Sequence, residues 1–233
     1  MKKNRSFPIP LTAFAILLFA HVAHSQYRFD VFGAATKPFD KDFEITTPQS
    51  TVPMKGTQSF SLGGRGGVRL GYDGKGHWGQ DFEYSYGSNA SKITNKSNGG
   101  QFALKIRSHR FSYNAIWYPA GMSPNKKVFP YVTAGVGGIF LTLPQNTINE
   151  ALDPGRAGLG QLRSENVVSF NTGAGVRVRV NKVYGFRFEV RDTMSRAVRY
   201  GLPKSSSDPK ATVFPIGGVF HQLDFLVSFV YYF

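Results

Sequence analysis

The last segment of the chain, residues 222–233, has the sequence QLDFLVSFVYYF. Large apolar side chains occupy every second position: Phe225, Val227, Phe229, Tyr231 and Phe233. The opposite phase begins with the polar residues Gln222 and Asp224. Successive side chains of a β-strand point to opposite faces, so this period of two predicts a strand with one strongly apolar face. Such a strand separates an apolar environment from a more polar one.

The same alternation recurs along the 233 residues. Glycine (26 residues) and aromatic residues (15%) are frequent and occur in short runs, which favours strands over helices. We therefore predict an all-β fold, an eight-stranded antiparallel transmembrane β-barrel with up-and-down connections. The predicted strands span residues 26–35, 59–72, 77–88, 101–118, 128–142, 166–180, 184–200 and 219–233.

Two of these segments leave the facing of their side chains open. In residues 101–118, the apolar phase of Phe102 differs from that of Phe111. We expect a β-bulge near residues 108–110 to reconcile the two phases. Residues 128–142 are apolar or small on both faces, so their facing is not determined, and the strand count is fixed only within two.

Alternation alone does not separate a membrane barrel from a soluble barrel with an apolar interior, but the lengths of the connections do. Outer-membrane barrels have short periplasmic turns and longer extracellular loops. With a periplasmic N-terminus, the connections alternate in this way along the whole chain. They span residues 36–58, 73–76, 89–100, 119–127, 143–165, 181–183 and 201–218.

Aromatic residues gather at the end of the barrel that carries the short turns. Amphipathic rings settle at the boundary between lipid and water, so this layer predicts an aromatic girdle. A soluble barrel has no reason to align such rings at one rim. The girdle residues are Tyr27, Tyr72, Trp78, Trp117, Tyr118, Phe129, Tyr131, Tyr184, Tyr231 and Phe233.

The start of the chain has the pattern of an export signal. Basic residues precede an apolar core at residues 11–20, and Ala23 and Ser25 place small side chains before a cleavage site. The apolar core is too short to span a membrane as a helix. We predict a cleaved signal peptide at residues 1–25 and a barrel domain at residues 26–233. The chain contains no Cys, which excludes disulfides, thiol chemistry and a lipoprotein anchor.

The alternating aromatic end of the chain resembles the signal by which the barrel-assembly machinery recognises outer-membrane proteins. Residues 130–137 (PYVTAGVG) and 172–177 (TGAGVR) resemble the small outer-membrane β-barrel domain family, the group around the barrel of outer-membrane protein A. The resemblance covers residues 26–233 and implies a place in the Gram-negative outer membrane, without a peptidoglycan-binding domain. It implies fold and location more firmly than activity.

The formal net charge of +14 first suggests a nucleic-acid binder, but the predicted location of the charges argues against one. Removal of the signal peptide leaves +11, and much of this charge falls on inward faces. Eight strands enclose a lumen only just wide enough for their own side chains, so we expect a charged plug and no nucleic-acid partner. The expected lumen charge network is Arg28, Asp30, Arg65, Arg69, Asp81, Glu83, Lys105, Arg107, Arg177, Arg179, Arg187, Glu189, Arg191 and Asp224.

Buried ions need partners, because desolvation of an unpaired charge costs several kcal/mol. The second and third predicted strands are neighbours, and their apolar faces fix the parity of their pairing. We expect Arg69 to face Asp81 or, if the turn is two residues tighter, Arg65 to face Glu83.

No catalytic, cofactor or metal site is predicted. The histidines show no metal-ligand spacing. Ser108 and Ser112 lie near His109, but no carboxylate is placed to orient the histidine. The glycine-rich residues 63–67 and 173–175 precede no helical pattern, so they are expected in the barrel wall rather than in phosphate-binding loops.

The sequence thus predicts a non-enzymatic outer-membrane barrel with a structural or surface-interaction role and a plugged lumen. A narrow, porin-like channel is the first alternative, and a lipid-modifying enzyme is a weaker one. The expected partners are outer-membrane lipid, lipopolysaccharide and the barrel-assembly machinery, while the oligomeric state is left open. We expect lipopolysaccharide contacts from one small patch at the extracellular rim, formed by Lys92, Lys96, Arg196 and Arg199.

Overall fold

The computed structural model describes residues 26–45, 54–74, 76–96, 101–123, 126–143, 163–201, 203–204 and 216–233. All regular structure in these ranges is β-strand. Among the described residues, no helix has the length and apolar character needed to cross a membrane. The strands are β1 (Gln26–Pro38), β2 (Lys41–Ile45), β3 (Met54–Phe60), β4 (Gly63–Asp73), β5 (Gly76–Asn95), β6 (Gln101–Met122), β7 (Val128–Thr142), β8 (Glu165–Arg179), β9 (Tyr184–Arg196) and β10 (Val219–Tyr232).

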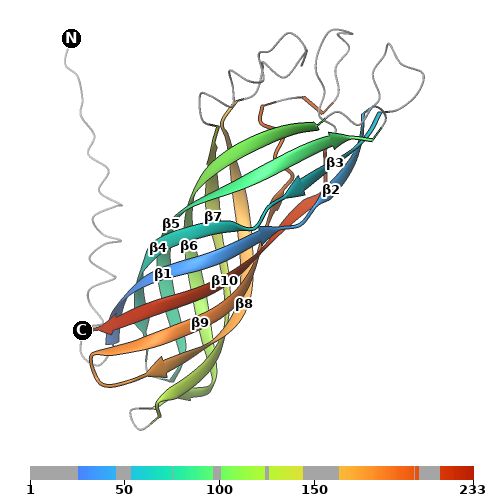
Figure 1. Ribbon diagram of the computed structural model, residues 1–233. Helices are drawn as coiled ribbons and strands as arrows, with labels where there is room; N and C mark the ends of the chain where they lie inside the picture. The colour runs from blue at the N-terminus through green and yellow to red at the C-terminus, as the bar shows by residue number, and fades with distance from the viewer. Residues whose placement is uncertain are drawn as a thin grey trace, which may run out of the picture.

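Eight of these strands close into an antiparallel barrel, as the sequence predicts (Figure 1). Around the wall the order is β1, β4, β5, β6, β7, β8, β9 and β10, and pairing of β10 with β1 completes the ring. Each strand therefore neighbours the strand that follows it in the barrel, which is the up-and-down arrangement.

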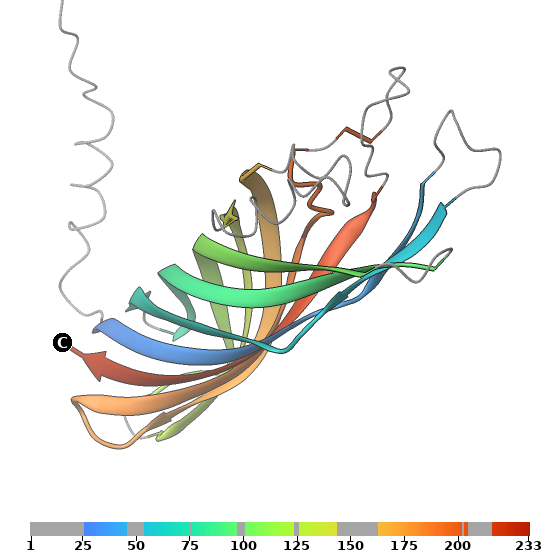
Figure 2. The same ribbon diagram turned by 45° about the horizontal axis from the view of Figure 1, so that its top comes forward.

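Strands β2 and β3 are an addition that the sequence analysis missed, because it treated residues 36–58 as a loop. They pair with each other, and β3 also pairs with the far part of β5. They continue the lines of β1 and β4 past the barrel wall, as Figure 2 shows. Their sequences, KDFEI and MKGTQSF, show no alternation of large apolar residues, and the buried face of β3 carries Gly56, Gln58 and Phe60.

The two ends of the barrel differ in their connections. Residue pairs such as Arg28 and Tyr232 place the start of β1 beside the end of β10. The short connections from β4 to β5, from β6 to β7 and from β8 to β9 lie at this same end (Figure 1). The long connections leave from the opposite end. By the rule for outer-membrane barrels, the end with the short turns faces the periplasm.

The predicted facing of the last strand agrees with the structure. Phe225, Val227 and Phe229 point outward and are about half exposed, whereas Ser228 and Val230 are buried in the interior. An exposed row of this kind is stable only against lipid, because in water it would form a large apolar patch.

Strand β7, whose facing the sequence left open, turns its odd-numbered residues inward. Phe129 and Tyr131 are buried and pack with Ile116 and Tyr118 of β6 at the periplasmic end. Placing Tyr118, Phe129 and Tyr131 in the aromatic girdle was therefore wrong. These rings face inward and pack together at the periplasmic end of the interior, while Trp78 and Trp117 point outward.

Strand β6 contains no bulge at residues 108–110. Its pairing with β5 runs without a shift from Gln101 to Trp117. Even-numbered residues therefore point inward along the strand. The apolar Ile106 is buried near the extracellular end because the interior there is apolar.

Candidate functional site

The interior of the barrel holds a continuous network of ion pairs, which begins near the periplasmic end. Asp73 accepts hydrogen bonds from Arg28, from Arg177 at 2.5 Å and from the Tyr118 hydroxyl at 3.0 Å. These groups come from strands β4, β1, β8 and β6, so one carboxylate joins four parts of the wall. Arg179 lies over the rings of Phe129 and Tyr232, where its cation contacts the faces of both rings.

The next layer is centred on Asp81 of β5. Its carboxylate accepts hydrogen bonds from Arg28 at 3.1 Å, Arg187 at 2.8 Å and the Asn114 amide at 2.7 Å. Arg187 also pairs with Glu189 and lies 3.4 Å from Asp30. Buried charges are tolerated only when their hydrogen-bonding groups are largely satisfied, and Asp81 and Arg187 meet that condition. Arg28 Nε and Asp30 Oδ1 have no hydrogen-bond partner among the described residues, but they lie 3.7 Å apart as an ion pair.

A further layer is centred on Glu83 of β5. It lies 2.8 Å from Arg69, 2.7 Å from Arg191 and 3.5 Å from Arg110. Arg110 reaches on to Asp224 at 2.8 Å. Glu83 therefore joins neighbouring β4 to β9, which lies across the lumen because the ring order places β5 and β9 four positions apart.

Most residues of the expected network do lie inside the barrel, and the charged members of the three layers are buried. Lys105 and Arg107 were placed wrongly, because both point outward and are exposed. The error follows from the expected bulge, which would have put odd-numbered residues of β6 inside. The inward residues that the structure brings in are Arg28, Asp30, Arg65, Arg69, Asp81, Glu83, Arg177, Arg179, Arg187, Glu189, Arg191 and Asp224.

Sequence reasoning missed two members, Arg110 and Asp73. Arg110 was assigned to the bulge and Asp73 to a turn. The regular alternation from Arg110 through Ser112 to Asn114 was the signal that could have placed Arg110 inside. Lys105 and Arg107 leave the expected interior, and Arg110 and Asp73 enter it. The net positive charge of the interior is therefore smaller than the sequence predicted.

Neither expected pairing between the second and third predicted strands occurs. Arg69 faces Glu83, and Gly71 faces Asp81. The ladder begins with Asp73 opposite Gly79, so the turn is wider than either alternative assumed. Odd-numbered residues of the two strands nevertheless face each other, as expected. An Arg meets a carboxylate because the inward faces of both strands carry charged residues.

Glycines on the inner face make room for the long side chains of the network. A Cβ at Gly71 would overlap the guanidinium of Arg28, and one at Gly175 would overlap the Tyr131 hydroxyl and the Phe188 carbonyl oxygen. The glycine-rich segments therefore belong to the barrel wall. Both lie within strands, β4 and β8, as expected.

Above the network the interior becomes mainly apolar. Phe60, Ile106, Ile139, Tyr200 and Phe220 contribute to a cavity of about 50 Å³ near the extracellular end. This volume exceeds the roughly 10–15 Å³ that one water needs, but it is below the roughly 150 Å³ of a cavity that holds benzene. Burial raises the pKa of the Tyr200 hydroxyl above its ordinary range.

The residues considered for catalysis do not converge. Ser108 and Ser112 point into the lumen, whereas His109 points outward and its Nδ1 lies 2.9 Å from the Tyr84 hydroxyl. Across the described ranges, no group of His, Asp and Glu has the arrangement of a metal site.

The four residues expected to contact lipopolysaccharide do not form one patch. Lys96 lies beyond the end of β5 and pairs with Asp42 at 3.1 Å, whereas Arg196 of β9 pairs with Glu165 at 2.9 Å. Because β5 and β9 lie on opposite sides of the ring, Lys92 and Lys96 are separated from Arg196 and Arg199. The sequence alone could not predict this separation, because it depends on the order of the strands around the ring.

The residues of the expected assembly signal form one outward row along β10. Phe233 is exposed, and its ring stacks on those of Tyr27 and Tyr231 with centroids 6.1 Å apart in each pair. The other members, Phe225, Val227 and Phe229, are exposed on the same face. Their role in recognition stays a prediction.

A closed antiparallel barrel with an apolar outer wall and a charged interior defines the class of outer-membrane β-barrel proteins. The family model of the outer membrane protein β-barrel domain matches residues 11–221. The chain belongs to this family and is a protein of the bacterial outer membrane. No curated protein matches the chain in sequence.

Solved outer-membrane barrels have a similar fold. The crystal structure of OprG from Pseudomonas aeruginosa is 13% identical, covers 90% of this chain and 96% of its own, and superimposes with a TM-score of 0.57. The N-terminal barrel domain of OprF from the same organism is also 13% identical, with coverage of 89% and 99% and a TM-score of 0.40. The likeness to OprG supports the fold alone, because the two chains are only 13% identical.

Proposed function

We propose that this protein is a closed, non-enzymatic outer-membrane barrel that acts through its extracellular end rather than as a channel. One observation carries the proposal. Arg191 and Glu83, on opposite sides of the ring, meet at 2.7 Å inside the lumen.

Other contacts support the same conclusion. Arg187 of β9 reaches Asp81 of β5 at 2.8 Å, and Arg110 of β6 reaches Asp224 of β10 at 2.8 Å. Each contact crosses the interior, and the contacts lie in successive layers along the axis. An ion crossing the barrel would have to displace charges that stabilise one another, and an eight-stranded wall leaves little space beside them.

Planar-bilayer recordings of the purified barrel test the proposal. Wild-type protein is expected to give no stable single-channel steps. The double variant Glu83→Ala/Arg191→Ala removes the pair that crosses the lumen, and it is expected to give more frequent openings because a gap appears between the walls. Heat-modifiability on gels shows whether each protein is folded.

Repeated steps in the nanosiemens range from folded wild-type protein would contradict the closed lumen and support the channel alternative. A quiet wild type together with an equally quiet double variant would show that the pair is not needed for closure.

A further inference from the structure

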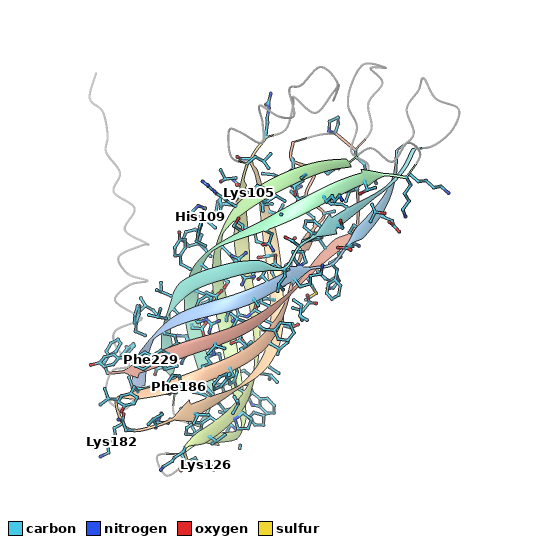
Figure 3. All side chains as sticks on the ribbon, in the orientation of Figure 1. Lys105, His109, Lys126, Lys182, Phe186 and Phe229 are labelled. Atoms are coloured by element: carbon cyan, nitrogen blue, oxygen red, sulfur yellow. The ribbon has the colours of Figure 1, made fainter. Side chains whose placement is uncertain are left out.

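The outer wall of β5 and β6 carries basic side chains near the extracellular end. Lys92 of β5, together with Lys105 and Arg107 of β6, points outward and is exposed. Lys105 lies opposite Ala90 of β5, and Arg107 lies opposite Ser88. Lys92 is two residues from Ala90 on the same face, so Lys92 and Lys105 are diagonal neighbours. Same-face neighbours on a strand lie about 7 Å apart, which brings the three cations into one cluster. Figure 3 shows Lys105 high on the wall, near His109.

This cluster lacks an acidic partner within the described part of the chain. No hydrogen bond or ion pair from the three side chains to another described residue is present. In contrast, Lys96 and Arg196 are paired with Asp42 and Glu165. Neighbouring like charges repel each other, so the cluster favours an anion from outside the chain.

The position of the cluster along the strand indicates its depth in the membrane. Trp117 lies at the periplasmic end of the outward face of β6, ten residues from Arg107. At about 3.3 Å per residue and a tilt of about 40°, ten residues rise about 25 Å, which is the height of the apolar band of such barrels. Arg107 therefore lies at the level of the headgroups of the outer leaflet.

The residues between these two levels fit that placement. The outward residues of β6 from 109 to 117 include no Lys, Arg, Asp or Glu. Just below Arg107, the His109 ring lies 5.0 Å from the Tyr86 ring, and its Nδ1 lies 2.9 Å from the Tyr84 hydroxyl. Aromatic rings with a polar edge mark the boundary between hydrocarbon and headgroups, so the basic cluster begins where the apolar band ends.

We propose that Lys92, Lys105 and Arg107 form a binding site for the phosphate groups of lipopolysaccharide in the outer leaflet. The membrane-facing position and the cationic charge both match this lipid, which presents phosphates at the headgroup level of the outer surface. The site replaces the rim patch predicted from the sequence, and it does not depend on whether the lumen conducts.

The test is calorimetric titration of detergent-refolded protein at about 0.15 M salt. The titrants are lipopolysaccharide, dephosphorylated lipopolysaccharide and phosphatidylglycerol. A Lys or Arg near an anionic lipid surface strengthens association about fivefold, so Lys105→Gln/Arg107→Gln is expected to bind lipopolysaccharide about 25-fold more weakly. Binding of the dephosphorylated form is expected to be weak for both proteins.

The matched control is Lys126→Gln/Lys182→Gln, which removes the same charge at the periplasmic end (Figure 3). It is expected to bind lipopolysaccharide like the wild type. The swap Lys105→Arg/Arg107→Lys retains the charge and is expected to retain binding. Both substituted positions of the test variant are exposed, and heat-modifiability on gels verifies that every variant is folded.

Three results would overturn the proposal. They are unchanged affinity of the test variant, an equal loss in the control variant, and an equal loss with phosphatidylglycerol. The last result would show that the cluster recognises any anionic lipid. Bilayer conductance reports separately on the closed lumen, so failure of this proposal is distinguishable from failure of the proposed function.

Discussion

At the scale of single residues, the interior is organised by carboxylates that each serve several arginines. Glu83 contacts Arg69, Arg191 and Arg110, and Asp81 contacts Arg28 and Arg187. A shared carboxylate makes the network cooperative, because its removal leaves several buried cations without a partner at once. When a surface carboxylate is removed, water can solvate the cation that it had paired with.

Neutralising Glu83 is therefore expected to destabilise the barrel strongly. Glu83→Gln should lower the free energy of unfolding by about 3–5 kcal/mol, the usual cost of breaking a buried ion pair. Urea-induced unfolding of protein refolded into lipid vesicles, followed by tryptophan fluorescence, measures the change.

Asp42→Asn is the matched control, because Asp42 is exposed and its partner Lys96 is exposed as well. Exposed pairs contribute little, so the urea midpoint of this variant should match that of the wild type. If Glu83→Gln unfolded at the same urea concentration as Asp42→Asn, the network would not be a source of stability.

At the scale of elements, each strand carries two different surfaces, and the last strand shows this most clearly. Its outward row ends at Phe233, which is 64% exposed. Because that ring is only partly covered, its loss should lower the free energy of unfolding by at most about 3 kcal/mol. Any larger effect of Phe233 in cells would come from recognition during assembly.

Deletion of Phe233 is accordingly expected to reduce the amount of folded protein in outer membranes by much more than it reduces the stability of the refolded barrel. Immunoblots of membrane fractions measure the first quantity, and thermal unfolding of refolded protein measures the second. Val219→Ala, an outward and exposed position at the other end of β10, is the control. Equal membrane levels of the wild type and the truncated chain would refute the role of the terminal row in assembly.

At the scale of the whole molecule, the barrel is asymmetric along its axis. The periplasmic end is closed by aromatic rings around Tyr118 and Tyr131, the middle by ion pairs, and the extracellular end by apolar residues around Tyr200. The extension formed by β2 and β3 rises from the extracellular end (Figure 2). The two ends of the barrel are therefore not interchangeable.

The signal peptide predicted at residues 1–25 lies outside the described residues and stays a prediction. We expect the protein purified from outer membranes to begin near Gln26. Intact-mass measurement with N-terminal sequencing checks this. Recovery of chains that retain Met1 would contradict cleavage, and recovery from the cytoplasm would contradict export.

Local pattern was sufficient for the strands and for most of their facing. Period-two alternation identified the eight strands of the wall, and it placed Phe229 outward and Arg187 inward, because facing within one strand depends only on neighbouring positions. The charged interior followed from the same alternation. Alternation failed to predict the facing of side chains where both faces of a segment are alike, as in residues 128–142. It also failed where the apolar phase changes, as at Ile106.

The sequence by itself determined the class of fold and the presence of an ionic interior, because these follow from patterns within short segments. It predicted eight wall strands within a margin of two, and ring closure in the structure fixes the number at eight. Only the tertiary structure decided which charges meet. That Arg69 faces Glu83 and that Arg191 reaches Glu83 across the lumen depend on strand register and on ring closure. That Lys105 lies on the outer wall follows from the unbroken pairing of β6 with β5, which leaves no bulge near residue 108. Register is set by contacts between strands distant in sequence, and a shift by two residues keeps every side chain on its face while it changes every partner.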